Sequence, residues 1–508
     1  MDLDCVGLTK QMTRRHAGKL LCMLPLCASV STYSQTPNPR ARSELDLDTS
    51  DPQLDQAFRW AKLEALSYVF DNDRVGPWYE ASLPGRHAFC MRDTSHQADG
   101  AQALGLSRYN HNMLRRFAEN ISASRDWCSY WEIDRENRPA PVDYKNDAEF
   151  WYNLPANYDV LDACYRMYLW SGDKSYVEDP VFLNFYDHTI IDYTERWDLT
   201  PDRIMKRTSK IQEPPFFRGD PTYEESSRNN LVGIDLLAAQ YAAFRAYAAI
   251  QTIRGNSESA HHALQTGAQI NLLINTVWWN SSQEHFYAFF DKEHRFLGRA
   301  GSDLLYRDAT DDGPRLASAL NTLLDTMKTE SEDAVEAKSH YAEILYRYGR
   351  PEEAYDQILD LTRDGRKRRE YPEVSYSVIG AMVTGLVGVR VRPRLPLQDM
   401  PANRPLEPIV ETLPQLTAKT KWIALRNLSV RGGKIDLHHD GNRSTMFTNK
   451  GKDALSWKAA FPGSFSELQI NGKAVRAQVE TTFLKHPTTW LETSVPAGET
   501  WTVRVSNG

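Results

Sequence analysis

The sequence predicts a mainly α-helical protein, an (α/α)6 barrel (six-hairpin toroid), followed by a C-terminal all-β sandwich domain. Three observations support this fold class. Apolar residues recur at helical spacing through residues 51–392 and give eleven candidate helices. Long connections, several of them rich in Trp, Tyr, Pro and carboxylates, separate these helices. After a linker at 393–418, short alternating runs and turn sequences fill 419–508.

The candidate helices would pair into the hairpins of such a barrel. The first one opens on Asp51-Pro52, an N-cap followed by proline in the first turn. About twelve helices would form six hairpins, with six inner and six outer helices, so we expect one helix beyond the eleven. The predicted ranges are 51–70, 94–104, 110–122, 156–170, 180–196, 231–254, 259–277, 315–327, 334–348, 351–361 and 374–389.

The C-terminal region carries the signals of β-hairpins. Its alternating runs are separated by turn sequences such as Asp440-Gly441-Asn442 and Asn471-Gly472. The predicted strands are 422–425, 429–430, 434–437, 444–448, 456–460, 467–470, 475–479 and 500–505.

The N-terminus resembles a secretory signal. Arg14, Arg15 and Lys19 precede an apolar run at 20–30, and small residues follow it. This run is too short to span a bilayer. We therefore expect a signal peptide at 1–31, a disordered linker at 32–50, and an exported protein, periplasmic or extracellular, that is not an integral membrane protein.

Composition narrows the function further. The net charge is −7 with no long block of like charge, so we expect no nucleic-acid partner. Thirteen Trp and 24 Tyr suit a carbohydrate cleft, although heavy core packing explains them equally well. Cys90, Cys128 and Cys164 follow the leader, which allows one disulfide. Neither Cys-x-x-Cys spacing nor a histidine cluster in the sequence accompanies them, so we expect no metal and no cofactor.

Glycoside hydrolysis requires two carboxyl groups, contributed here by loops distant in sequence. One such segment, 83–97, runs into the helix at 94–104 and contains Arg92, Asp93, His96 and Gln97. Arginine donates in a fixed fork and aspartate accepts from hydroxyls, so we expect Arg92 and Asp93 to bind sugar. The alternative is that Asp93 only caps the helix.

The other two loops supply candidate catalytic carboxylates. Adjacent carboxylates beside aromatic residues raise one another's pKa, as a general acid requires, and arginine neighbours keep a base ionised. In both loops the alternative is that acidic residues favour a helix start. The acid candidates in the loop at 216–226 are Glu224, Glu225 and Asp220, next to Tyr223; the base candidates in the loop at 368–376 are Glu373 and Glu370, next to Tyr371.

A fourth segment, 147–157, combines aromatic and amide side chains. We expect Trp151 and Tyr152 to stack on a sugar ring and Asn153 to bind its hydroxyls.

In these residues and in its organisation over about 51–390, the chain resembles the six-hairpin glycosidases, which include glucoamylases, trehalases and α-L-rhamnosidases. Arg92-Asp93 is similar to the pair that binds the terminal sugar in glucoamylases. Tyr223-Glu224-Glu225 resembles their aromatic-Glu-Glu, whose first Glu is the acid. Glu370 and Glu373 stand where those enzymes carry the base. The rhamnosidase motif Gly-Asp-Arg-Arg-Glu is absent, so no single family is implied.

The sequence therefore predicts an exo-acting, inverting glycoside hydrolase acting on an oligo- or polysaccharide, with Glu224 as acid and Glu373 as base. One alternative is a polysaccharide lyase acting on a uronate-containing glycan, which could recruit His96, Asn153, Tyr371 or Tyr376. The other is a non-catalytic glycan-binding protein.

Overall fold

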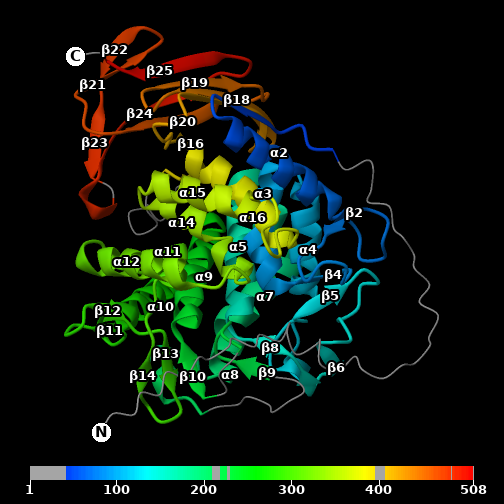
Figure 1. Cartoon of the computed structure of the whole chain (residues 1–508). Coiled ribbons are helices and arrows are strands. Elements are labelled where there is room, and N and C mark those ends of the chain that lie inside the picture. The colour runs from blue at the N-terminus through cyan, green and yellow to red at the C-terminus, as the bar shows by residue number, and fades with distance from the viewer. Residues whose placement is uncertain (1–41, 209–217, 226–228, 395–406, 482, 507–508) are drawn as a thin grey trace.

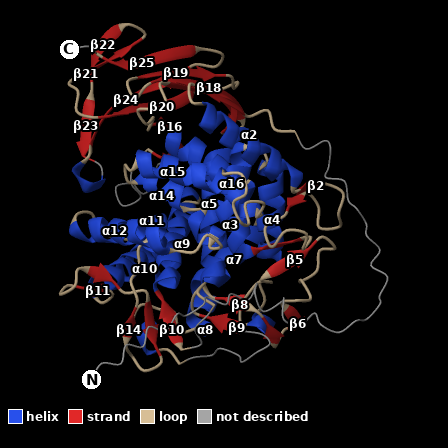
Figure 2. Ribbon diagram, viewed as in Figure 1, coloured by secondary structure: helices blue, strands red, loops and turns tan. Residues whose placement is uncertain are grey.

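The structure, a computed structural model, describes residues 42–208, 218–225, 229–394, 407–481 and 483–506. Helices fill the centre of the molecule, larger sheets form one end and short hairpins the other (Figures 1 and 2). The helices are α2 (Pro52–Ser67), α3 (Met91–Ala103), α4 (Ser107–Glu119), α5 (Pro155–Ser171), α6 (Ser175–Glu178), α7 (Pro180–His188), α8 (Thr194–Arg196), α9 (Ile234–Ile253), α10 (Ser257–Thr276), α11 (Ser302–Tyr306), α12 (Pro314–Thr329), α13 (Val335–Lys338), α14 (Tyr341–Arg347), α15 (Pro351–Thr362) and α16 (Pro372–Ala381).

Six of these helices contact one another in a closed sequence. Helix α3 packs between α16 and α5, α5 packs on α9, α9 on α11, α11 on α14, and α14 on α16. Helices α2, α4, α10, α12 and α15 lie outside this ring, each against one or two of its members. Burial follows the same division. All of α16 is buried except Ser377, whereas α12 buries four residues: Leu316, Ala319, Leu320 and Leu323.

The predicted helices differ from the observed ones at two places that matter for the site. The range 334–348 is two helices, α13 and α14, with His340 in the connection between them. Helix α11 was not predicted, because five residues are too few to show a helical period. Two π-helical segments extend helices: η2 (Thr189–Tyr193) follows α7, and η4 (Met382–Leu386) follows α16.

Two sheets form the C-terminal region and face each other through stacked Phe447 and Trp457, whose ring centroids are 4.8 Å apart. The first has the order β1 (Asp46–Thr49), β17 (Trp422–Val430), β18 (Gly433–Asp440), β19 (Ser444–Asn449), β25 (Thr500–Val505), β21 (Glu467–Ile470) and β22 (Lys473–Arg476). The second has the order β15 (Val389–Pro393), β16 (Pro408–Thr412), β20 (Leu455–Pro462), β24 (Pro487–Val495) and β23 (Gln478–Thr481).

The remaining strands and turns are short and lie among the helices. The strands are β2 (Val69–Phe70), β3 (Trp78–Tyr79), β4 (Ala88–Cys90), β5 (Glu132–Asp134), β6 (Tyr144–Asn146), β7 (Glu149–Phe150), β8 (Tyr152–Asn153), β9 (Arg218–Asp220), β10 (Asn230–Gly233), β11 (Trp279–Asn280), β12 (His285–Phe286), β13 (Phe289–Asp291) and β14 (Phe296–Leu297). The short helical turns are η1 (Ala123–Arg125), η3 (Ile204–Lys206) and η6 (Phe483–Lys485).

Both segments predicted as linkers contain strands. Strand β1, within 32–50, pairs with β17, and β16, within 393–418, lies between β15 and β20. These pairings join residues far apart in the chain, so local patterning gives no sign of them. The predicted signal peptide, 1–31, lies outside the described residues.

Two further sequence expectations concern cysteines and membranes. Cys90, Cys128 and Cys164 are buried, and the disulfide that the sequence allowed is not formed among them. Within the described residues, no helix is both long and apolar enough to cross a membrane.

The closest approach between α3 and α16 depends on Gly100. A Cβ atom there would lie 2.0 Å from the Tyr376 carbonyl oxygen, whereas one at the facing Gly380 would meet nothing nearer than 3.5 Å. Gly100→Ala should therefore lower the free energy of unfolding by about 1–3 kcal/mol or more, the effect of overpacking a core. Gly380→Ala is the matched control and should cost far less. Equal urea midpoints for the two variants would contradict this contact.

Candidate active site

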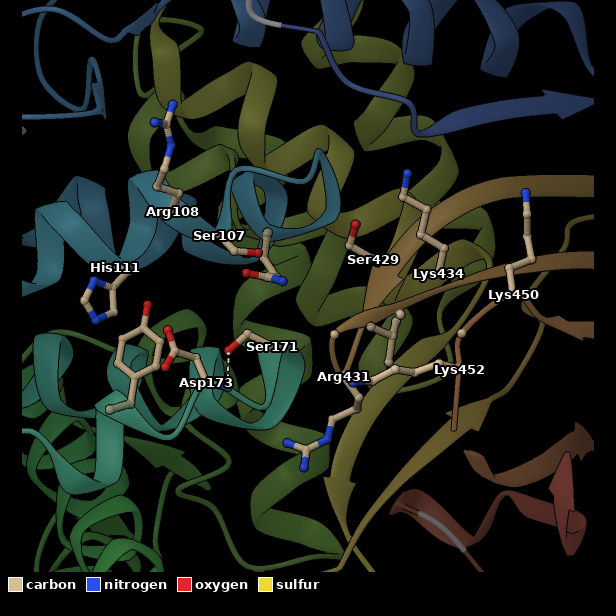
Figure 3. A pocket seen from close by; sticks show the side chains of 16 residues that line it. Ser107, Arg108, His111, Ser171, Asp173, Ser429, Arg431, Lys434, Lys450 and Lys452 are labelled. Atoms are coloured by element: carbon tan, nitrogen blue, oxygen red, sulfur yellow. Dashed lines mark hydrogen bonds between the residues drawn. The ribbon is translucent and has the colours of Figure 1, made fainter. Parts of the chain in front are cut away.

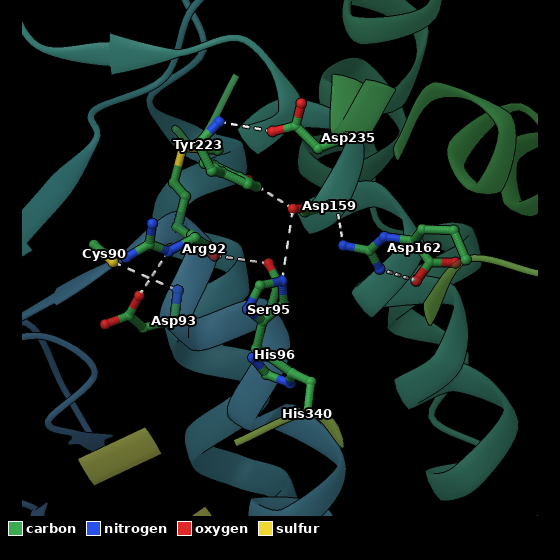
Figure 4. Close-up of polar contacts among 12 residues, drawn as sticks. Cys90, Arg92, Asp93, Ser95, His96, Asp159, Asp162, Tyr223, Asp235 and His340 are labelled. Atoms are coloured by element: carbon green, nitrogen blue, oxygen red, sulfur yellow. Dashed lines mark hydrogen bonds and ion pairs between the residues drawn. The ribbon is translucent and has the colours of Figure 1, made fainter. Parts of the chain in front are cut away.

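A small cavity lies among the N-terminal turns of α3, α5, α9 and α11 and beside the start of α14 (Figure 4). Its volume is about 80 Å3, room for two or three water molecules at about 30 Å3 each. Most of the residues that line it carry a polar side chain; they are His96, Asp159, Tyr223, Asp235, Ala239, Ser302, Asp303, Tyr306, Arg307, Ala337, His340 and Ile344.

Two histidines of this lining hold Glu373. The Glu373 carboxylate is fully buried at the start of α16, directly after Pro372 in the first helical position. Its Oε1 lies 3.2 Å from His96 Nδ1 and 2.8 Å from His340 Nε2. Its Oε2 has no hydrogen-bond partner among the described residues. The carboxylate is thus fixed by one oxygen, and the other remains available as an acceptor.

The surroundings of His96 keep its imidazole neutral. Burial lowers the pKa of His96 well below its usual value, and His340, Arg307 and Arg92 lower it further. The His96 and His340 ring centroids are 4.4 Å apart, at an edge-to-face angle. Protonating His96 would therefore add a further positive charge beside Arg307 and Arg92.

Asp159, on the second turn of α5, connects two other lining residues. It forms an ion pair with Arg307, and its Oδ2 accepts a hydrogen bond of 2.6 Å from the Tyr223 hydroxyl. Burial raises the pKa of Asp159, while Arg307 and Tyr223 oppose that rise. Arg307 also contacts Asp162, at 3.4 Å. This network fixes the Tyr223 ring at the cavity wall.

Asp235, in the first turn of α9, presents an oxygen without a partner. Its Oδ2 accepts from the Tyr223 amide at 2.6 Å and the Thr222 hydroxyl at 3.0 Å. Its Oδ1 is buried and has no hydrogen-bond partner among the described residues. A Cβ at Gly233 would lie 2.2 Å from Oδ1, so only glycine leaves room for this carboxyl. Burial, and next the charge of Asp303, raise the pKa of Asp235 to about 7.

The predicted sugar-binding pair flanks this cavity. Arg92 Nε lies 3.2 Å from Asp93 Oδ1, and the guanidinium is over the Tyr223 ring, 5.2 Å from its centroid. The Tyr371 hydroxyl donates to Asp93 Oδ2 at 2.5 Å. Arg92 and Glu225 also line an adjacent cavity of about 180 Å3. The structure therefore brings together residues from all three predicted loops.

Other predicted residues lie elsewhere. Trp151, Tyr152 and Asn153 are fully buried, and the Trp151 indole donates to Asn153 at 2.8 Å, so they form core and not a stacking platform. The sequence of segment 147–157 does not indicate that its aromatic side chains point into the core. Four other predicted residues differ in burial: Gln97 and Asp220 are buried, Glu224 is partly buried, and Glu370 is exposed.

Most of the cavity's charged groups were not predicted from the sequence. Asp159 and Asp235 lie inside apolar helices, where an isolated carboxylate is a signal of an interior polar site. Arg307 and His340 lie at helix ends and carried no such signal. The donor atoms of His96, His340 and Glu373 lie within 4.8 Å of one another, a spacing that a divalent cation could bridge, although the sequence led us to expect no metal.

A further cavity, of about 780 Å3, lies between the helices and the C-terminal sheets (Figure 3). Four of its five cationic side chains are already compensated. Arg108 pairs with Asp71, Lys434 with Glu44 and Lys450 with Asp436, while Arg431 donates to the carbonyls of Tyr168 and Leu169. Its chemistry favours a junction between the two regions and not a reaction site.

Comparison with known proteins adds a likeness of fold. No protein-family model and no curated protein sequence matches this chain. An α-L-rhamnosidase from Dictyoglumus thermophilum has a TM-score of 0.59 at 13% identity, covering 92% of this chain and 50% of that one. The α-L-rhamnosidase of Aspergillus terreus has a TM-score of 0.51 at 11% identity, covering 90% of this chain and 51% of that one. A sialidase has a TM-score of 0.55 at 11% identity, covering 87% of this chain and 41% of that one.

This chain thus spans about half the length of these proteins, or less. Their identities are low, so the likeness concerns the fold alone. At that level, the resemblance to six-hairpin glycosidases, a group that includes the α-L-rhamnosidases, is confirmed.

Proposed function

We propose that the protein is an exo-acting glycoside hydrolase that uses two carboxyl groups and inverts the anomeric centre. The closed ring of α3, α5, α9, α11, α14 and α16 would be the inner layer of an (α/α)6 barrel. One observation carries the proposal. The cavity at the N-terminal turns of this ring is lined by a carboxyl group with a raised pKa, Asp235, and by the two histidines that fix the Glu373 carboxylate. Carboxyl groups in such different environments are the signature of an acid and a base.

Glu373 is the proposed general base. His96 and His340 hold Oε1, which leaves Oε2 as the oxygen that would accept a proton from a water molecule. Room for two or three waters in the cavity supports an inverting reaction, in which water attacks from the face opposite the leaving group. Action on a terminal sugar is proposed from the resemblance of Arg92-Asp93 to the pair that binds the terminal sugar in glucoamylases.

Two carboxyl groups are candidates for the general acid. Glu224, the acid expected from the sequence, is partly buried, and its amide donates to the Thr222 hydroxyl at 3.0 Å. Asp235 lines the cavity itself, and its raised pKa keeps it protonated close to neutrality. We therefore place Asp235 first and Glu224 second. Arg92, above the Tyr223 ring, is the proposed contact to the terminal sugar.

A specific observation keeps the lyase as a second candidate. The lowered pKa of His96 gives a neutral imidazole, which can accept a proton, and Arg307 carries the charge that would neutralise a uronate. Either activity would act on an oligo- or polysaccharide. Export of the protein also remains a proposal, since the predicted signal lies outside the described residues.

Stereochemistry provides the test of the hydrolytic mechanism. Proton NMR at early times of a reaction with an accepted glycoside should show the product anomer opposite to that of the substrate, before mutarotation mixes the two. A first product with the substrate's own anomeric configuration would contradict the inverting mechanism.

A further inference from the structure

A second cavity beside the candidate active site, of about 670 Å3, reaches strands of the C-terminal sheets. It is lined by residues of α5, α9, α14, η4, β15, β20, β23 and β24. It shares Tyr306 and Arg307 with the smaller cavity, so these two side chains separate the two spaces. A ligand here would be distinct from a substrate at Glu373.

The lining of this second cavity has an excess of positive charge. Eight of its side chains are Arg or Lys and six are Asp or Glu. Most of the cations have acidic partners in the wall. Arg166 pairs with Asp99 and Asp162, Arg347 pairs with Glu343, and Lys458 lies 2.7 Å from Glu480.

Two arginines of the lining differ from the others. Within the described residues, neither Arg390 nor Arg245 forms an ion pair, and Arg390 donates only to the Thr384 carbonyl oxygen, at 3.3 Å. Burial and the charge of Arg347 lower the pKa of Arg390, while Asp308 and Glu343 oppose that fall. Burial and Arg390 lower the pKa of Arg392 to about 10, although Arg392 forms an ion pair with Glu411. A negative ligand would relieve this mutual repulsion.

Neutral groups in the same wall offer further donors and apolar faces. The Tyr165 hydroxyl and the Trp490 Nε1 are buried and have no hydrogen-bond partner among the described residues. Tyr165 as a whole is only 9% exposed. The rings of Trp170, Trp490 and Phe483 line the cavity beside them. Glu492, in the same lining, can accept from hydroxyl groups. Donors, acceptors and aromatic faces together match a sugar ring.

We propose that this cavity binds an anionic sugar, a uronic acid or a short oligosaccharide that contains one, at a site separate from the candidate active site. Arg390 would bind the carboxylate, with Arg245 contributing at the rim. Trp490 would stack on the ring, and Tyr165 would donate to a ring or hydroxyl oxygen. The inference goes beyond the proposed hydrolase activity, because none of these four residues lines the smaller cavity.

Calorimetric titration of the full chain tests the proposal. The probes are D-glucuronate and D-galacturonate, with D-glucose as the neutral match and inorganic phosphate as the bare anion. At least one uronate should bind saturably. Glucose lacks the carboxylate and should bind about tenfold more weakly or not at all, the expected effect of one lost charge-assisted contact. Phosphate keeps the charge but lacks the ring that Trp490 would stack on, so it should also bind about tenfold more weakly or not at all. Absence of uronate binding, or phosphate binding as tight as that of the uronates, would overturn it.

Variants locate the binding. Arg390→Gln and, separately, Arg245→Gln at the exposed rim should each weaken uronate binding, the first by about tenfold or more. The control is Arg476→Gln, on exposed strand β22, which should bind like wild type. Asp235→Asn should also leave the affinity unchanged, which separates this site from the active-site cavity. Uronate binding that depends on Asp235 and not on the two arginines would contradict the second site. Thermal unfolding of each variant confirms that it is folded.

Discussion

Replacing Glu373 by Gln is expected to lower kcat by about 10²–10⁴-fold, the range for loss of a general base. Glutamine keeps an oxygen that can accept from His96 or His340, so the fold should survive. It cannot take a proton from water. The measurement is steady-state hydrolysis of an accepted glycoside, with thermal unfolding as a check on the fold.

Glu370→Gln is the matched control for this experiment. Glu370 lies three residues away in the same loop, but its side chain is exposed. Its variant should keep near wild-type kcat. If the Glu370 variant loses activity and the Glu373 variant keeps it, the base is assigned to the wrong carboxylate.

The second large effect is expected in the pH dependence. Asp235 must be protonated to act as the acid, and its pKa is raised to about 7. In the wild type, kcat/KM should therefore fall as the pH rises through about 7. Asp235→Asn should remove this limb and lower kcat/KM by about 10²–10⁴-fold on substrates with poor leaving groups. An aryl glycoside with an acidic phenol needs little protonation and should be hydrolysed much better by this variant.

Asp303 gives a finer version of the same test. Its negative charge contributes to the raised pKa of Asp235. Asp303→Asn should move the alkaline limb to lower pH without abolishing it. If the limb persists in Asp235→Asn and disappears in Glu224→Gln, then Glu224 is the acid, as the sequence first suggested.

The sequence could predict those parts of the molecule that depend on local patterns. Helical periodicity located most of the helices, and the aromatic-acidic loops located Tyr223 and Glu373, which the structure places in or against one cavity. Both residues lie close to the start of a predicted helix. This position indicated the site, because the N-terminal turns of the ring helices meet at the same end of the ring.

Features that depend on contacts between distant segments could not be predicted. Arg307, at the end of α11, forms an ion pair with Asp159 on α5. His340 contacts Glu373 from a connection that was predicted to be helical. The prediction that Trp151 and Tyr152 stack on a sugar ring was wrong for a related reason. An aromatic side chain in a loop can face solvent or core, and only the packing of β8 against the helices decides which.

The most direct test of the proposed activity is the release of sugar from a panel of aryl glycosides and polysaccharides by the purified full chain. A hydrolase should release a free monosaccharide from at least one of them, and Glu373→Gln should suppress that release. A product that absorbs in the ultraviolet as an unsaturated uronate would show a lyase instead. Saturable glycan binding with no new reducing ends across the panel would contradict an enzyme of either kind.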